Sequence, residues 1–266
     1  MNTGQAEIKM CIMKRLKDII PIFLIAVLFY TLQSCKKDDY YIDGGLAHAK
    51  FDGPIMAYLD AKPREFDTIA KIIRLAGLEE DFMTKEFTFF APRDENIKRL
   101  IGLARGNSQN GASGVNQQLY QLGRDTIKTL ADIDSVIWRK YLLRYMFNGK
   151  RKLMDYPQID FDLLNVYKGQ NYTSLGNTVS NIGVVYNDAI NDSDKNNITR
   201  LKYMGYRQLY ISYIPDLSRP RDWISCPIAS SDIQPDNGVV HIIDYTRAEF
   251  GYSRSEVFND ILESKR

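Results

Sequence analysis

The feature that most constrains this chain is an apolar run at residues 19–32, which follows a basic stretch with Lys14, Arg15 and Lys17. Ser34 and Cys35 come directly after the run. A basic stretch, an apolar segment and a small-residue end, in this order, are typical of a secretory signal. As a helix the run would measure about 21 Å, shorter than the roughly 30 Å hydrocarbon core of a membrane. The sequence therefore predicts a cleaved export signal over residues 1–34, starting most naturally at Met13, and an exported domain after it.

The end of the signal, Leu32-Gln33-Ser34-Cys35, resembles a bacterial lipobox. This resemblance implies that the signal is cut before Cys35 and that the Cys35 thiol receives the lipid. Two alternatives stay open: an uncleaved anchor, and an apolar stretch with no export function. Residues 35–52 would form a polar tether, whose Lys36-Lys37-Asp38-Asp39 start resembles the tag that sends lipoproteins to the outer face of the outer membrane. A periplasm-facing position is the alternative.

Removal of the signal also removes the excess of basic residues. The chain has 35 basic and 33 acidic residues, of which four and two precede Cys35, so 31 of each remain. A net charge of zero gives no general drive toward nucleic acid, because such binding depends on counterion release by basic residues. If Cys35 is lipidated, Cys226 has no partner for an intramolecular disulfide. The exported fold must then rest on its hydrophobic core.

Helical and strand patterns both occur in the exported part. The clearest helix is expected to begin near Asp67, which would cap it, and to stop at Gly77. The run Phe87-Thr88-Phe89-Phe90 is typical of a buried strand. The other expected helices span residues 94–104 and 134–147, and the other expected strands span residues 182–186, 209–214 and 239–244.

Two motifs near the ends of this part resemble the two signatures of fasciclin (FAS1) domains. The first is Thr68-Ile69-Ala70 through Ala76-Gly77-Leu78, followed by Phe87-Thr88-Phe89-Phe90-Ala91-Pro92-Arg93-Asp94-Glu95, and the second is Asn237-Gly238-Val239-Val240-His241-Ile242-Ile243-Asp244. Between them, Met146 replaces the histidine of the family's usual Tyr-His pair. The resemblance covers residues 53–250. It implies an α+β fold, a β-wedge of mixed sheet with flanking short helices.

The two motifs are further apart than is usual in the family, which predicts loop insertions near residues 106–134 and 150–201. Residues 106–114 are rich in Gly, Asn and Ser and are expected to form a flexible surface loop. A second domain within residues 150–201 is disfavoured because their Asn, Asp and Gly content leaves little to bury. Residues 251–266 are expected to form a C-terminal helix or tail.

Few groups that could catalyse a reaction are present. The chain has two histidines, His48 in the tether and His241 in an apolar strand pattern. A buried, hydrogen-bonded His241 is the simplest interpretation, with a catalytic base or a metal ligand as alternatives. Cys226 is expected to be buried rather than reactive, because no basic neighbour in sequence would lower its pKa. The sequence therefore predicts no enzyme activity, no metal site and no cofactor.

Residues 192–196 alternate oxygen-bearing side chains as a calcium loop does. Positions six and twelve of that loop would be Asn197 and Tyr203, where an EF-hand has Gly and Glu. We therefore expect a solvated polar turn.

Tyrosine is abundant around the strand expected at residues 209–214. Alternation places Leu209, Ile211 and Tyr213 on one face of that strand. Because tyrosine offers a flat apolar ring with a polar tip, the cluster can stack on sugars or hold a protein, and cross-strand packing is the alternative. The candidate ligand contacts are Tyr203, Tyr206, Tyr210 and Tyr213.

FAS1 domains in general are adhesion and matrix-binding modules. The resemblance therefore implies a lipid-anchored, non-catalytic module at the outer membrane of the cell envelope that recognises a protein or a glycan. The alternative is an accessory subunit of an outer-membrane nutrient-uptake or surface-assembly complex, with a membrane protein as partner. Exposed aromatic residues in a groove would favour a glycan, and a contiguous apolar patch above a few hundred Å² would favour a protein.

Overall fold

The computed structural model describes residues 49–103, 114–191, 193, 198–219 and 222–265. All of them belong to one compact unit, His48–Arg266. The expected export signal, Cys35 and His48 lie outside the described residues, as do residues 106–113 of the expected surface loop.

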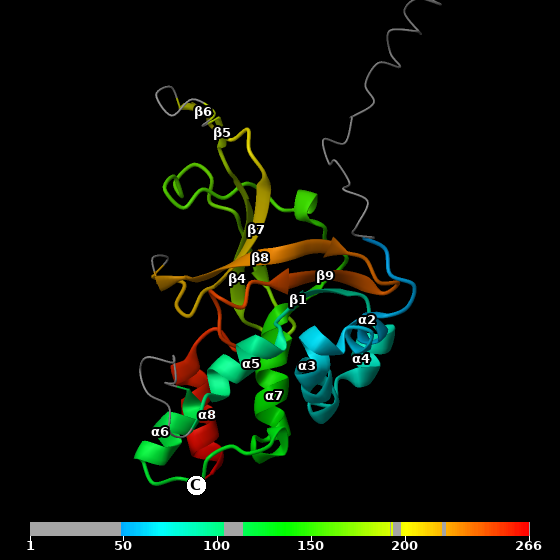
Figure 1. Cartoon of the computed structure of the whole chain (residues 1–266), viewed down its shortest axis with the longest axis vertical. Coiled ribbons are helices and arrows are strands. Elements are labelled where there is room, and N and C mark those ends of the chain that lie inside the picture. Colours follow the sequence, from blue (N-terminus) through cyan, green and yellow to red (C-terminus); the bar gives the residue numbers. More distant parts are fainter. Residues whose placement is uncertain (1–48, 104–113, 192, 194–197, 220–221, 266) are drawn as a thin grey trace, which may run out of the picture. The chain divides into compact units, whose positions relative to one another are not determined.

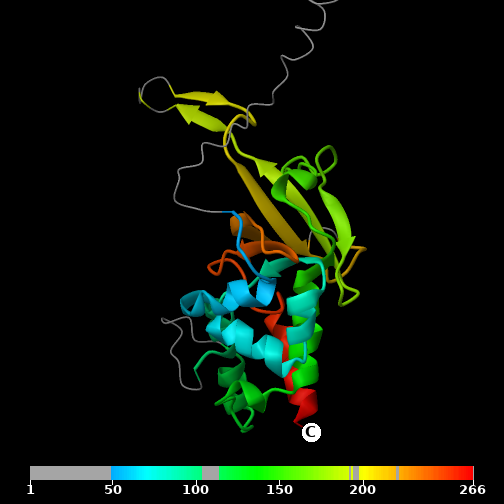
Figure 2. The same ribbon diagram turned by 90° about the vertical axis from the view of Figure 1, so that its right-hand side faces the viewer.

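Seven strands form one mixed sheet in the order β2-β1-β9-β8-β7-β4-β3 (Figure 1). Strands β1 and β9 are parallel, and the other neighbours are antiparallel. The strands are β1 (Phe87–Ala91), β2 (Met146–Asn148), β3 (Gln170–Thr173), β4 (Val179–Tyr186), β7 (Arg207–Tyr213), β8 (Ile224–Ile233) and β9 (Gly238–Ile243). A two-stranded hairpin, β5 (Ala189–Asn191) and β6 (Thr199–Leu201), extends beyond the ends of β4 and β7 (Figure 2). The expected α+β class is confirmed.

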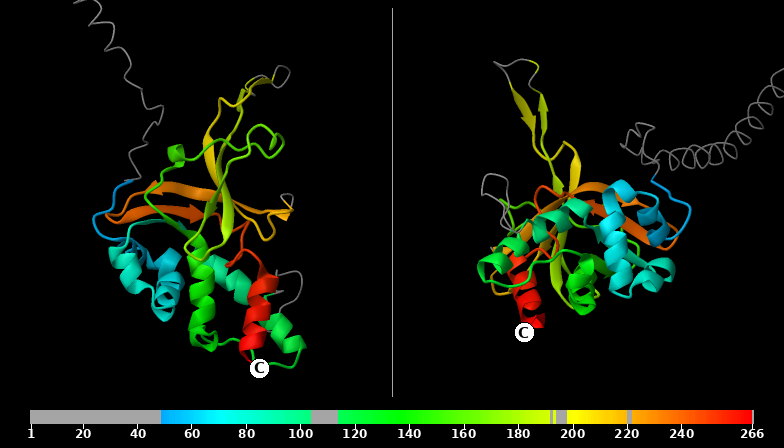
Figure 3. Two further views of the ribbon diagram at one scale, coloured as in Figure 1. Left: turned by 180° about the vertical axis from the view of Figure 1, so that it is seen from behind. Right: turned by 60° about the horizontal axis from the view of Figure 1, so that its bottom comes forward.

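The helices gather on one side of the sheet, beside β1 and β9 (Figures 1 and 3). They are α2 (Ile55–Asp60), α3 (Pro63–Leu75), α4 (Glu79–Thr84), α5 (Asp94–Ile101), α6 (Val115–Gln121), α7 (Ser135–Leu142) and α8 (Arg254–Ser264), with short 3₁₀ turns η2 (Leu130–Asp132), η3 (Leu143–Tyr145) and η4 (Leu153–Asp155). The expected helix or tail after residue 250 is therefore the helix α8.

Strand β8 divides the sheet into two halves. Its first residues, up to Pro227, pair with β7, and its later residues, from Ile228, pair with β9. The register shifts twice along the second part, where Asp232 has φ +64°. Such bulges bend a strand and increase its twist. We call β2, β1, β9 and the helices the inner half, and β7, β4, β3 and the hairpin the outer half.

The inner half is built on two fully buried strands. Every residue of β1 and β9 is buried. Strands covered on both faces have near-continuous apolar sequences, as these two have. The strands approach closely where Phe87 lies opposite Gly238, and a Cβ at Gly238 would collide with the carbonyl oxygen of Phe87. Only glycine fits at this position without a shift of the backbone.

The four expected strands are confirmed as β1, β4, β7 and β9. The expected start of the first helix is wrong, because Pro63 at N1 begins α3 four residues earlier than Asp67. Asp67 does not cap the helix and instead pairs with Lys71 at 2.6 Å. The helix expected over residues 94–104 is also too long, because α5 ends at Ile101 and Gly102 follows it with φ +62°.

The helix expected over residues 134–147 is too long. α7 ends at Leu142, and Met146 begins β2, where it lies opposite Phe89 of β1. Pairing with β1 overrides the helical spacing of these residues. The expectation that residues 150–201 have little to bury is also wrong. Ile159, Ile182 and Val184 are buried there, and β4 lies within the sheet.

Candidate functional site

The outer half contains a hollow of about 700 Å³, which we call the outer groove. It lies between the loop that precedes β3, the end of β4 and the β5–β6 hairpin. Small-molecule sites typically have volumes of roughly 300–1,000 Å³. The groove is lined by residues 159–163 and 185–188 and by Ile190, Arg200, Lys202, Tyr203 and Tyr206.

One side of the groove is a turn of residues 202–206, which we call the tyrosine turn. Tyr203 within it has φ +62°, a left-handed conformation that is rare for a bulky side chain. Its backbone N–H donates to Oδ1 of Asp188 at 3.0 Å, and its Oη donates to Oδ2 of Asp160 at 2.8 Å. Arg207 donates to its carbonyl oxygen at 3.0 Å. These contacts hold a backbone conformation that would otherwise be disfavoured, and such positions cluster at functional sites.

Further backbone contacts make the tyrosine turn rigid. The N–H of Gly205 donates to the carbonyl oxygen of Asn187 at 2.7 Å, and the N–H of Asn187 donates to that of Tyr206 at 3.1 Å. A Cβ at Gly205 would lie 2.5 Å from the carbonyl oxygen of Asp188, so a glycine is required. Arg207 also binds the carbonyl oxygen of Gly205 at 2.7 Å and stacks 3.7 Å from the ring centre of Tyr186.

Two large side chains of the tyrosine turn, Met204 and Tyr206, are exposed to solvent. Tyr206 is 67% exposed although its backbone is fixed on both sides. Ile190 and Phe161, which also line the groove, are exposed as well. The groove therefore combines accessible apolar area with the polar side chains around it.

The charges of the groove are mixed. Asp160 accepts from Tyr203 Oη and from the backbone N–H of Asp162. Burial would raise the pKa of Asp160, but these hydrogen bonds outweigh it and lower the pKa. Asp188 lies 3.6 Å from Arg200. Within the described ranges, no hydrogen bond or ion pair reaches the carboxylate of Asp162.

The structure brings two of the four candidate tyrosines into the groove, Tyr203 and Tyr206. Tyr210 is half-buried, and its ring packs edge-on against Phe161 with centres 5.2 Å apart. Tyr213 is only 5% exposed and takes part in a different cluster. The expected alternation along the strand is confirmed, since Leu209, Ile211 and Tyr213 are all buried. For Tyr210 and Tyr213, the observed contacts are packing contacts.

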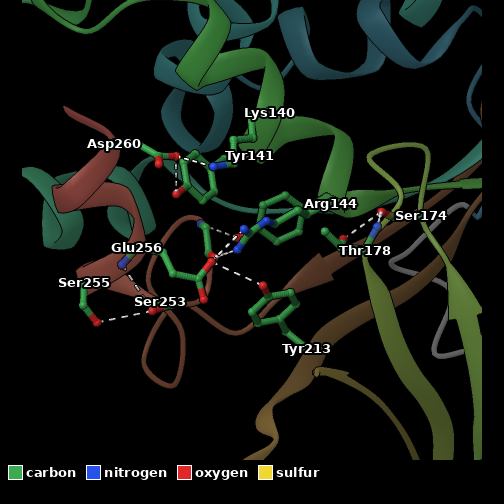
Figure 4. Close-up of polar contacts among 12 residues, drawn as sticks. Lys140, Tyr141, Arg144, Ser174, Thr178, Tyr213, Ser253, Ser255, Glu256 and Asp260 are labelled. Atoms are coloured by element: carbon green, nitrogen blue, oxygen red, sulfur yellow. Dashed lines mark hydrogen bonds and ion pairs between the residues drawn. The ribbon is translucent and has the colours of Figure 1, made fainter. Parts of the chain in front are cut away.

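Tyr213 belongs to what we call the Arg144 cluster (Figure 4). The guanidinium of Arg144 lies between the rings of Tyr141 and Tyr213, 4.5 Å and 4.6 Å from their centres. It donates to Oε2 of Glu256 at 2.7 Å, and Tyr141 Oη donates to Asp260 at 2.8 Å. Glu256 and Asp260 are in α8, so these contacts attach α8 to α7, η3 and β7. A buried cation of this kind is paired rather than free.

His241 and Cys226 are both buried, as the sequence predicts. His241 Nε2 donates to the carbonyl oxygen of Arg151 at 2.9 Å, and Nδ1 accepts from the N–H of Asp232 at 3.2 Å. Burial lowers the pKa of His241 to about 4, so the ring is neutral at pH 7. Burial raises the pKa of Cys226 to about 12, so its thiol stays protonated.

Within the described residues, His, Cys, Asp and Glu form no group of three or more that could hold a metal ion. None of the helices described has the length and apolar character needed to cross a membrane. The calcium-loop-like residues 192 and 194–197 lie outside the described ranges.

Sequence reasoning missed several groove residues. Asp160, Phe161 and Asp188 lie in two different stretches of the chain, and only the fold brings them together with the tyrosine turn. The local signal that could have pointed to the turn is Gly205 within a tyrosine-rich stretch. In comparisons with known proteins, no family model matches this chain and no curated protein matches it.

Proposed function

We propose that the chain is a lipid-anchored, non-catalytic binding module of the cell envelope, with a FAS1-like fold, that recognises a glycan or a protein. The observation that carries this proposal is the outer groove, where Tyr206 is exposed on a rigid turn. An exposed aromatic ring with a fixed backbone offers contact area at little entropic cost. The exposure of this ring is explained by recognition of a ligand rather than by a contribution to stability.

The contacts between the two motifs support the FAS1-like fold. The second motif lies beside the first, because β9 pairs with β1 in parallel register from Gly238 opposite Phe87 onward. Asp94 Oδ1 accepts from the N–H groups of Thr68 and Ile69, which joins the two parts of the first motif. The motif residues thus have structural functions that explain their identity.

Asn237 in the second motif has a similar function. Its Oδ1 accepts from the N–H of Ile55 at 2.7 Å, and its Nδ2 donates to the carbonyl oxygens of Phe82 and Lys85 at 3.0 Å each. Met146, which replaces the family histidine, is fully buried on β2 beside β1. A buried apolar residue there is compatible with a packing function at this position.

The state of the nucleophilic and basic groups supports a non-catalytic module. His241 and Cys226 are buried in the inner half and in β8, away from the groove lining. In the groove, Asp160 and Asp188 are already hydrogen-bonded to the tyrosine turn. Catalysis needs titratable groups that can reach a reacting atom, and these four groups are either buried or hydrogen-bonded within the fold.

Two experiments test this proposal. Substitution Cys35→Ser should abolish fatty-acid labelling and leave the protein released or retained as a precursor, and continued labelling would contradict the lipid anchor. For recognition, the chain from Lys36 onward keeps the whole compact unit of residues 48–266. It would serve as bait on solubilised envelope proteins and on a glycan array. Failure to retain any protein or glycan would contradict a binding module.

A specific observation also favours the second candidate, an accessory subunit of an outer-membrane complex. The β5–β6 hairpin and its base expose large apolar side chains on both faces, and exposed apolar clusters mark interaction sites. They are Ile190, Ile198, Leu201 and Met204. Capture of an outer-membrane protein that is lost when Leu201 and Met204 are replaced by Ser would support this candidate.

A further inference from the structure

We infer that the outer groove is a binding site for a neutral oligosaccharide, with Tyr206 as the ring on which a sugar stacks. This inference rests on the proposed function and deepens it by naming the ligand class.

The stacking surface comes from the outward-facing ring of Tyr206. A sugar ring has an apolar face of C–H groups and a rim of hydroxyls, so it needs a flat apolar surface next to polar groups. Tyr206 is the most exposed aromatic side chain among the groove residues. Ile190 of the hairpin and Phe161 also line the groove and add to its apolar area. Tyrosine suits this contact because its hydroxyl can stay hydrated while its ring is covered.

Hydroxyl-binding groups also line the groove. The carboxylate of Asp162 accepts no hydrogen bond from the other described residues, so it has full acceptor capacity. Lys202, whose Nζ lies 4.8 Å from the ring centre of Tyr203, adds donors nearby. A sugar hydroxyl both donates and accepts hydrogen bonds, so it can bind to a lining that contains both acceptors and donors.

The charge balance favours a neutral ligand over an anionic one. The lining carries three carboxylates, Asp160, Asp162 and Asp188, against two cations, Arg200 and Lys202. The guanidinium of Arg200 lies 3.6 Å from the carboxylate of Asp188, so part of its charge is already balanced within the protein. The carboxylate of a uronate or sialate in the groove would therefore be repelled by these aspartates, which disfavours binding of an anionic sugar.

The rigidity of the tyrosine turn explains why a strained residue is retained there. Tyr203 keeps its left-handed backbone through contacts to Asp160, Asp188 and Arg207. These contacts set the position of Tyr206 before any ligand arrives, so binding does not have to order the turn. Arg207 is therefore a positioning residue, which acts through the turn and is absent from the groove lining.

The test uses the chain from Lys36 onward and titrates it with short neutral hexose oligosaccharides and with uronate oligosaccharides of matched length. We expect saturable binding of at least one neutral oligosaccharide and weaker or no binding of the uronates. Tyr206→Ala should weaken binding roughly tenfold or more, as loss of an aromatic stacking partner does elsewhere. Tyr206→Phe should stay within a few-fold of the parent, and the matched control Tyr120→Ala, on α6, should bind as the parent does.

Two further variants distinguish a residue that contacts the sugar from one that positions the tyrosine turn. Asp162→Asn should weaken binding without a change in the unfolding midpoint. Arg207→Met should weaken binding although it touches no ligand, and its near-ultraviolet circular dichroism should report the altered tyrosine environment. Equal binding by the parent and Tyr206→Ala would overturn the inference.

The outcomes for the inference and for the proposed function differ. Preference for uronates over neutral oligosaccharides would overturn the inference and leave a binding module. Capture of an envelope protein with no sugar binding would also overturn it while supporting the proposed function. Retention of neither class would contradict both.

Discussion

The inner and outer halves share one sheet but use it differently. In the inner half every residue of β1 and β9 is buried, whereas every residue of β6, and all but one residue of β3, is exposed. This difference in burial indicates that the inner half contributes most of the free energy of unfolding. The outer half supplies exposed side chains on a well-fixed backbone.

Each half also contains a buried or half-buried arginine, Arg144 in the inner half and Arg207 in the outer half. Arg144 attaches α8 through contacts to Glu256 and two rings and faces no groove. Arg207 has similar stacking on Tyr186 but holds carbonyl groups of an exposed turn. The same side-chain chemistry therefore fixes a helix in one half and presents a tyrosine in the other.

The largest expected effect is on the stability of the inner half. Phe89 is fully buried in β1, with its ring 4.9 Å from that of Phe82. Phe89→Ala should lower the free energy of unfolding by about 3–5 kcal/mol, because it removes apolar contact and leaves a cavity. Urea denaturation measures the loss. Phe161→Ala, the matched truncation in the outer half, should cost below about 1 kcal/mol, and equal costs would break the comparison.

The next effect concerns pH and His241. Its pKa is lowered from 6.5 to about 4 in the folded state, so between these values the unfolded chain binds more protons than the folded chain. Stability from this group is complete above pH 6.5 and is lost as the pH falls toward 4, by up to about 3 kcal/mol. His241→Gln should show a shallower fall over this window in urea denaturation. The same slope in both proteins would contradict the assignment to His241.

A smaller effect is expected at Asp94, which joins the two parts of the first motif. Asp94→Ala should cost about 1–3 kcal/mol, because the N–H groups of Thr68 and Ile69 lose their acceptor. Asp94→Asn keeps an oxygen in place and should cost less. The control Asp67→Ala, at an exposed position of α3, should stay within about 0.5 kcal/mol. A cost at Asp67 equal to that at Asp94 would contradict the account.

The smallest effect on stability is expected in the groove itself. Tyr206→Ala should change the free energy of unfolding by about 0.5 kcal/mol or less, because the side chain is exposed and its backbone contacts remain. Thermal unfolding followed by circular dichroism measures this. A large loss would show that the ring stabilises the hairpin, and the division between the halves would then fail.

The sequence predicted the inner half better than the outer half, for physical reasons. Strands β1 and β9 are dense apolar runs whose burial is visible in the residues themselves. The helix ends were harder, since pairing of Met146 with Phe89 stops a helical pattern and depends on residues far away in the chain.

The groove could be predicted only in part. Tyr203 and Tyr206 stood out by residue type, but Asp160 and Asp188 reach Tyr203 from 43 and 15 residues away. No spacing rule links such positions. Tyr210 and Tyr213 belong to the same stretch as the groove tyrosines, and only the packing of Phe161 and Arg144 distinguishes them.

The most direct test of the division between the halves is backbone hydrogen exchange, measured by mass spectrometry on the chain from Lys36 onward. Exchange reports local opening free energies from near zero up to that of global unfolding. We expect the slowest exchange in β1 and β9. We also expect that addition of the tightest-binding oligosaccharide protects residues 185–190 and 200–206 selectively. Slow exchange confined to the outer half, or ligand protection confined to the helices, would contradict these expectations.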